Sequence, residues 1–171
     1  MLSTVTVFDD NTLSQIARVA SIEQKKRNHL LVAVAVTVCT IGNLLSYRSL
    51  LFQLVVCLLG ALDFSLPKLN YKRMLKLTLA REREIFQTPR TIRTDFKDDE
   101  IANTNLESNN TTTLQYDSLL KLYESADYLV FLTKGKQCLP LSKGQLTNGT
   151  ADELIALIKS KAPECKHRKY S

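Results

Sequence analysis

The chain has 171 residues, of which 44% are hydrophobic and 23% are charged, and its formal net charge at pH 7 is +6. The mean hydropathy of −0.09 is that of an average soluble domain, but the hydrophobic residues are concentrated in residues 30–66, where only two side chains are charged. The positive excess falls in residues 67–85, with six basic and two acidic side chains, whereas residues 86–171 are nearly neutral. This distribution disfavours nucleic acid as a partner, because a nucleic-acid binder spreads Lys and Arg over a folded face.

Residues 1–28 contain a predicted strand followed by a predicted helix. Leu2 to Phe8 is rich in Thr and Val, which favours a strand. The next apolar side chains recur at helical spacing from Leu13 to Ala20, after Asp10 and Asn11, either of which can cap a helix. This helix either lies at a membrane interface, docks on the C-terminal part of the chain, or extends the helix that follows.

Two apolar runs of 18 residues, Leu30 to Tyr47 and Ser49 to Leu66, form a predicted transmembrane helical hairpin within residues 29–66. At about 1.5 Å per residue each run reaches roughly 27 Å, close to the hydrocarbon thickness of a thin bilayer. A buried helical hairpin of a soluble protein is disfavoured, because so small a chain could hardly cover two such helices. Asp63 lies near the end of the second run, where its carboxylate is expected to reach the headgroup water.

Basic residues flank the predicted spans. Lys25, Lys26 and Arg27 come before them, and four more basic residues, Lys68, Lys72, Arg73 and Lys76, follow in the connector of residues 67–85. The positive-inside rule then predicts a multi-pass protein of the cell (cytoplasmic) membrane with both termini in the cytosol. The four connector residues are expected either to contact the anionic inner leaflet of the lipid bilayer or to serve only as topology signals on a solvated connector.

Residues 86–171 alternate short β-branched or apolar runs with turn residues, which predicts a cytosolic antiparallel sheet or barrel. The predicted strands are Thr91–Phe96, Ile101–Glu107, Thr111–Tyr116, Leu119–Tyr123, Tyr128–Thr133 and Gln137–Leu141. Pro140 is expected at a strand end or a sheet edge. Thr150 and Glu153 form a capping box that starts an amphipathic helix, and Pro163 stops it. Such a helix can close one end of the sheet, as in pleckstrin-homology (PH)-like barrels.

The order of these elements resembles the bacterial YcxB-like proteins. The resemblance rests on the acidic turn Asp98–Ile101, the stretch Tyr116–Glu124 followed by Asp127-Tyr128, the pair Leu139-Pro140, and the final helix. Tyr116 stands where that family commonly has Trp. The resemblance implies a membrane-anchored, PH-like cytosolic domain of unestablished molecular role, and it supplies no catalytic residues.

The sequence offers little reactive chemistry. Its two histidines, His29 and His167, are far apart, and its four cysteines include no C-x-x-C pair. The five glycines form no phosphate-binding loop. We therefore predict no catalytic residues, no metal site and no cofactor, and we expect that the protein is not an enzyme.

The sequence as a whole predicts an α+β membrane protein in which a two-helix transmembrane hairpin carries a PH-like domain that is capped by a helix. Its expected role is non-enzymatic binding or scaffolding of an unidentified membrane or cytosolic protein, through the Tyr123 and Tyr128 face or by strand addition at an open sheet edge. Self-association is left open. The alternative is a signal-transducing, immunity-type or transporter-accessory protein whose hairpin makes the functional contact.

Overall fold

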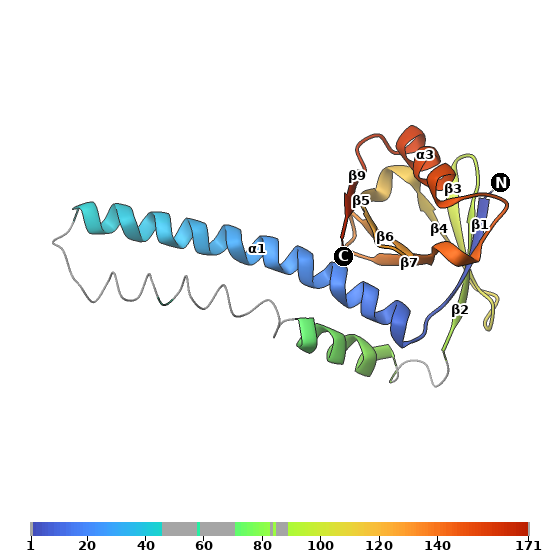
Figure 1. Cartoon of the computed structure of the whole chain (residues 1–171), viewed down its shortest axis with the longest axis horizontal. Helices are drawn as coiled ribbons and strands as arrows, with labels where there is room; N and C mark the ends of the chain where they lie inside the picture. The colour runs from blue at the N-terminus through green and yellow to red at the C-terminus, as the bar shows by residue number, and fades with distance from the viewer. Residues whose placement is uncertain (1, 46–57, 59–70, 83, 85–88, 171) are drawn as a thin grey trace. The chain divides into compact units, whose positions relative to one another are not determined.

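The computed structural model describes residues 2–45, 58, 71–82, 84 and 89–170. The chain divides into two compact units: Met1–Ile16 with Leu79–Ser171 form the first, and Ala17–Thr78 form the second. All the strands that the described residues form belong to the first unit (Figure 1). The N-terminal strand, predicted in a segment of its own, therefore shares a unit with the strands of the C-terminal half.

Five strands form the first sheet, in the order β4-β3-β2-β1-β8. Their bounds are β1 Leu2–Val7, β2 Thr91–Phe96, β3 Glu100–Asn105, β4 Thr111–Gln115 and β8 Leu146–Thr147. All neighbours in this sheet pair antiparallel. β1 is an inner strand because it pairs with β2 on one side and with β8 on the other.

Four strands form the second sheet, in the order β7-β6-β5-β9. Their bounds are β5 Leu119–Glu124, β6 Tyr128–Thr133, β7 Cys138–Ser142 and β9 Lys166–Lys169. β5, β6 and β7 pair antiparallel, whereas β9 pairs parallel with β5. Pro140 lies in β7 at the end of this sheet, as predicted. A proline cannot donate a ladder hydrogen bond, and an edge strand tolerates it because no donor is needed on the strand's outer side.

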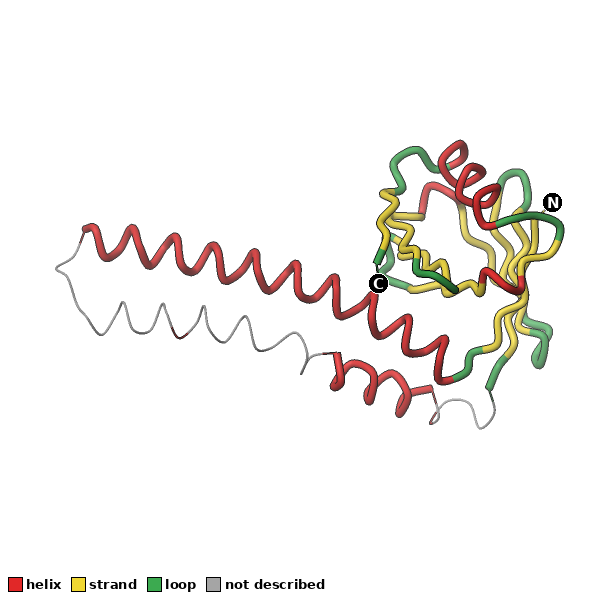
Figure 2. The backbone as a smooth tube through the Cα atoms, viewed as in Figure 1, coloured by secondary structure: helices red, strands yellow, loops and turns green. Residues whose placement is uncertain are grey.

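The hydrophobic core lies between the two sheets and α3, which spans Ala151–Lys161 (Figure 2). Leu154 and Ile158 of α3 are 0% and 2% exposed and pack with Phe96, at the end of β2, and Phe131, in β6. The predicted capping box is present: Glu153 N–H donates to the Thr150 hydroxyl, and Thr150 N–H donates to the Glu153 carboxylate. The box satisfies backbone donors at the start of the helix.

α1 is one continuous helix from Asp10 to Leu45. It joins the predicted N-terminal helix to the first predicted span. The sequence changes from amphipathic to fully apolar at Leu30, but this change does not interrupt the helical hydrogen bonds of the backbone. Side chains of the apolar part, including Leu30 and Val38, are exposed in the described chain.

The predicted two-span transmembrane hairpin is wrong. Among the described residues, no helix combines the length and the apolar character needed to cross a membrane. Apart from Leu58, the second predicted span, 49–66, and with it Asp63, lies outside the described residues.

Two further predictions are corrected on the same ground. The α+β fold class with a membrane hairpin is replaced by two β-sheets, α3, the long helix α1 and a helical stretch at residues 71–82. The multi-pass location in the cell membrane with both termini in the cytosol is also wrong, because it was predicted from the two spans.

Candidate functional site at the edge of β4

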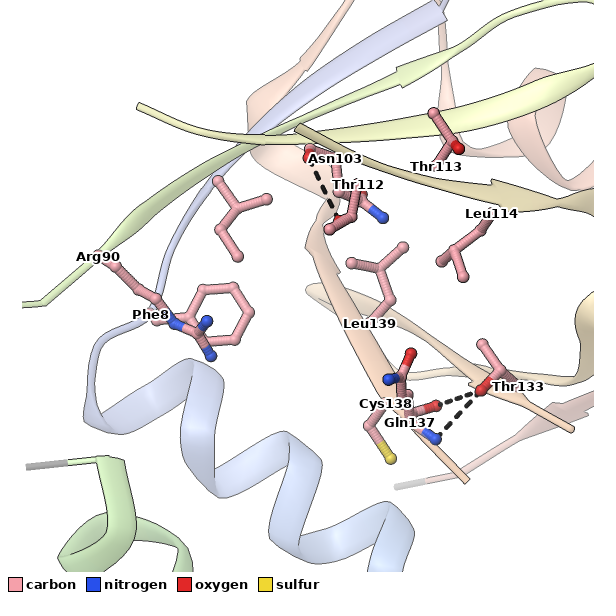
Figure 3. Close-up of a pocket in the computed structure, with 11 residues that line it drawn as sticks. Phe8, Arg90, Asn103, Thr112, Thr113, Leu114, Thr133, Gln137, Cys138 and Leu139 are labelled. Carbon is pink, nitrogen blue, oxygen red and sulfur yellow. Dashed lines mark hydrogen bonds between the residues drawn. The ribbon is translucent and has the colours of Figure 1, made fainter. Parts of the chain in front are cut away.

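A cavity of about 600 Å³ opens in the first unit, beside the edge of β4 (Figure 3). Its wall combines neutral polar and apolar side chains with a single guanidinium, and the described lining contains no carboxylate and no histidine. The lining residues are Phe8, Arg90, Ile92, Asn103, Thr112, Thr113, Leu114, Thr133, Gln137, Cys138 and Leu139. Ile92 is near the start of β2, whereas Phe96, at the end of that strand, packs in the core with α3. The cavity thus reaches from the start of β2 to Leu114 and Leu139, which border the hydrophobic core.

The cavity lies on one face of the first sheet and reaches the edge of β4, because the register places Ile92, Asn103 and Thr112 on the same face. Thr112, Thr113 and Leu114 are consecutive residues of β4, and all three line the cavity. Because successive side chains of a strand point to opposite faces, the contact with Thr113 shows that the cavity extends around the outer edge of β4. On the other side of the cavity, Gln137, Cys138 and Leu139 lead into β7.

The register between β3 and β4 shows which backbone groups of β4 point outward. Asn105 N–H donates to the carbonyl of Asn110 at 2.9 Å, and hydrogen-bonded and non-hydrogen-bonded pairs alternate along an antiparallel ladder. The pair Ala102 and Thr113 is therefore non-hydrogen-bonded. The N–H and C=O groups of Thr113, and by the same alternation those of Thr111 and Gln115, face away from β3.

β4 lacks the features that protect the other sheet ends in the described part of the chain. Proteins block exposed edges with short strands, with proline or with Lys and Arg. β8 has two residues, β7 contains Pro140, and β9 carries Lys166, Arg168 and Lys169. β4, with the sequence TTTLQ, has five uncharged residues and no proline. The edge beside the cavity is thus the one most open to strand pairing.

Arg90 and Phe8 form one wall of the cavity. The guanidinium carbon of Arg90 lies 4.4 Å from the centre of the Phe8 ring, and its Nε donates to Oε1 of Glu82 at 2.7 Å. The backbone joins the same two segments, because Phe8 N–H donates to the carbonyl of Arg90 at 2.8 Å. Ring stacking and the ion pair hold the guanidinium in place, with 26% of the side chain exposed.

The turn between β6 and β7 forms the opposite wall. Thr133 N–H donates to the carbonyl of Gln137 at 2.9 Å, and Gln137 N–H donates to the Thr133 hydroxyl at 3.1 Å. Lys136 lies between them with a φ of 62°, a left-handed conformation that closes such a turn. These bonds fix the turn that faces the edge of β4.

A third group of polar residues lies near the acidic turn. The Tyr116 hydroxyl donates to the carbonyl of Lys97 at 2.7 Å. Burial, together with the charges of Asp98 and Asp99, raises the pKa of Tyr116 above its ordinary value. The phenol therefore stays protonated and holds η1, Tyr116–Ser118, against the turn that follows β2.

The predicted site residues lie in several places. Lys68 is outside the described residues, while Lys72, Arg73 and Lys76 are exposed on the helical stretch 71–82. Tyr123 is 1% exposed, and its ring lies edge-on to Tyr170 at 6.1 Å between centres. Tyr123 therefore packs inside the unit, and of the two tyrosines only Tyr128, half-buried at the start of β6, reaches the surface.

Sequence reasoning predicted an open sheet edge as a contact site but did not identify the strand. The pattern that could have done so is the uncharged TTTLQ stretch, compared with the proline of β7, the Lys and Arg of β9 and the two-residue length of β8. Nothing local in the sequence shows that Phe8 and Arg90 meet beside that strand. Within the described residues, no group of three or more His, Cys, Asp or Glu could hold a metal ion.

Residues 96–158 match the family whose model is described as YcxB-like protein. The resemblance predicted from the sequence is thereby confirmed over this segment, which runs from the last residue of β2 into α3 and includes β4 and the β6–β7 turn. A search of curated proteins gave no match to the chain.

Proposed function

We propose, from the premise that residues 96–158 form a YcxB-like region, that this protein is a non-enzymatic binding protein which takes up an extended peptide segment of a partner protein along β4. The observation that carries the proposal is the position of the cavity, which reaches the one unprotected strand edge among the described sheet ends. A peptide that pairs with Thr111, Thr113 and Gln115 adds a sixth strand to the first sheet.

The cavity supports this function because it can hold the side chains of an added strand. Leu114, Leu139 and Ile92 offer apolar surface, while hydroxyl and amide groups of Thr112 and Gln137 offer hydrogen bonds. In strand addition the main chain supplies affinity, and pockets for alternate side chains supply specificity. The volume falls within the ~300–1,000 Å³ of ordinary ligand pockets.

The lining favours binding over catalysis. General acid–base chemistry needs a titratable group within hydrogen-bond reach of the substrate. The described lining has no carboxylate or imidazole and so places no such base beside its one thiol, that of Cys138. Its guanidinium, that of Arg90, is engaged by Phe8 and Glu82. The prediction that the protein is not an enzyme remains a prediction.

The test uses the full chain and a phage-displayed library of random twelve-residue peptides. A selected peptide is measured by titration calorimetry against the wild type, Thr113→Pro and Thr113→Val. Proline removes the outward N–H of β4 but leaves the ladder with β3, so we expect binding to weaken at least tenfold, about 1.4 kcal/mol. Valine keeps the N–H and the β-branched shape, so binding should stay within about twofold.

Hydrogen exchange supplies a second measurement that does not depend on the proline variant. The bound peptide should slow amide exchange at Thr111, Thr113 and Gln115. A Thr112→Phe variant, which fills part of the cavity, should weaken binding while β4 still pairs with β3. Failure to select any peptide, or equal affinity in the proline and valine variants, would overturn the proposal.

A further inference from the structure

β9 ends the second sheet on the side opposite β7, and it is strongly basic. It pairs with β5 on one side only, since it ends the order β7-β6-β5-β9, and it lies close to the C-terminus (Figure 1). Its four residues, KHRK, include three that carry a permanent positive charge. These three, Lys166, Arg168 and Lys169, are exposed.

The cations of β9 are placed at regular positions along the strand. Lys166 and Arg168 are two residues apart, so their side chains lie on the same face, about 6.6 Å apart along the strand. Lys121 of β5 stands opposite Lys166 in the parallel register. Lys121 therefore adds a third basic side chain to the face that carries Lys166 and Arg168.

The other face of β9 already holds a carboxylate. Glu124 of β5 lies 2.7 Å from Nε2 of His167 and 2.8 Å from Nζ of Lys143, with Nζ of Lys169 at 3.9 Å. The hydrogen bond from Lys143 is the largest influence that lowers the pKa of Glu124 below its ordinary value. The basic side chains around β9 thus bind a glutamate within the protein itself.

The open edge distinguishes polypeptide from other anions. The alternating N–H and C=O groups on the outer side of a strand match those of an extended polypeptide chain, which can continue the ladder, whereas a phosphate offers acceptors only. The lysines and the arginine of β9 would repel a second copy of β9, because like charges would meet across the new strand pair. An uncharged strand added at this edge would give these cations no ionic partners. Repulsion of some partners combined with attraction of one is how an interface gains specificity.

We infer that the outer edge of β9 binds an extended acidic segment of another protein, with alternate Glu or Asp side chains paired to Lys166 and Arg168. This site is separate from the cavity beside β4 and does not depend on the function proposed above. A purely protective role for the three cations predicts only that their removal promotes aggregation. The binding role predicts in addition a saturable, position-specific affinity for acidic peptide.

The test uses the full chain and fluorescence anisotropy with a labelled ten-residue peptide of alternating Glu and Thr. The matched peptide replaces each Glu by Gln. We expect saturable binding of the Glu peptide that weakens as salt is raised, at least tenfold weaker binding of the Gln peptide, and slower amide exchange in β9 on binding.

Two double variants separate position from net charge. Lys166→Glu with Arg168→Glu should weaken binding at least tenfold, and Lys166→Gln with Arg168→Gln serves if the first pair fails to fold. Lys134→Glu with Lys136→Glu changes two exposed cations on the β6–β7 turn by the same total charge, and binding should change less than about threefold. Thr113→Pro should leave the binding unchanged, which keeps this test apart from that of the β4 site.

Three results would overturn the inference. Equal weakening by both Glu double variants would mean that only net charge matters. Equal affinity for the Glu and Gln peptides would remove the role of the cations. Tighter, β9-dependent binding of a ten-nucleotide oligothymidylate or of vesicles containing phosphatidylserine would assign the surface to nucleic acid or to lipid instead.

Discussion

The carboxylate of Glu124 in β5 lies 2.7 Å from Nε2 of His167 in β9. The two residues are 43 positions apart in the sequence, and their contact joins the C-terminal strand to the second sheet. Lys143 of η2, Lys143–Gln145, reaches the same carboxylate from the connection between β7 and β8. One side chain, with 12% of its surface exposed, therefore joins three separate segments.

Glu124→Gln should destabilise the protein by about 1–2 kcal/mol at pH 7, because hydrogen bonds to a charged partner are lost. The pKa of Glu124 is lowered in the folded state, so its contribution is fully present above the unfolded pKa, near the ordinary value of 4.5, and is lost as the pH falls through the folded pKa. Urea unfolding of both proteins from pH 7 to pH 3 should show the difference shrink below about pH 4.5. The control is Asp127→Asn, an exposed carboxylate. A difference that is constant with pH would contradict this assignment.

Gly149→Ala should destabilise the protein by about 1–3 kcal/mol, the usual effect of overpacking. A Cβ at this position would overlap the side chain of Leu2 and would lie 2.8 Å from Oε2 of Glu153. Gly144→Ala is the matched control, since a Cβ there meets nothing within 4 Å. Urea unfolding midpoints measure both. Similar midpoint shifts in the two variants would show that space around Gly149 is not limiting.

Thr150→Ala should cost about 1 kcal/mol of stability, because it removes the hydroxyl that accepts from Glu153 N–H at the start of α3. Thr150→Ser keeps the hydroxyl and should restore most of the loss. Lys159→Ala, an exposed change near the other end of α3, should change stability by less than about 0.5 kcal/mol. Thermal unfolding followed by circular dichroism compares the three, and an alanine variant as stable as the serine variant would argue against the cap.

Phe8 and Arg90 should be energetically coupled. A double-mutant cycle with Phe8→Leu and Arg90→Gln isolates the stacking of the guanidinium on the ring, at 4.4 Å, from the loss of buried apolar surface at Phe8. We expect a coupling energy of about 0.5–1 kcal/mol from urea unfolding. Additive effects of the two changes would mean that the stacking contributes nothing to stability.

Sequence patterns determined the elements whose formation is local. The strands Thr91–Phe96 and Tyr128–Thr133 were predicted with the bounds that the structure has, because alternating β-branched or aromatic residues and flanking turn residues define them. The helix after Thr150 was predicted for the same kind of reason, since a capping box and an apolar stripe lie within a dozen residues. The unprotected composition of TTTLQ is also local.

Tertiary structure decided what depends on partners distant in the sequence. KHRK has none of the composition of a strand, and it becomes β9 only because β5 offers an edge and Glu124 offers a carboxylate. The cavity exists only where Phe8 and Arg90, 82 positions apart, meet beside β4. The predicted hairpin was wrong, since no helix among the described residues has the length and apolar character of a span, and the apolar residues from Leu30 onward instead continue α1 from its start at Asp10. Period and capping are therefore readable along the chain, whereas strand order, edges and cavities arise only when distant segments pack together.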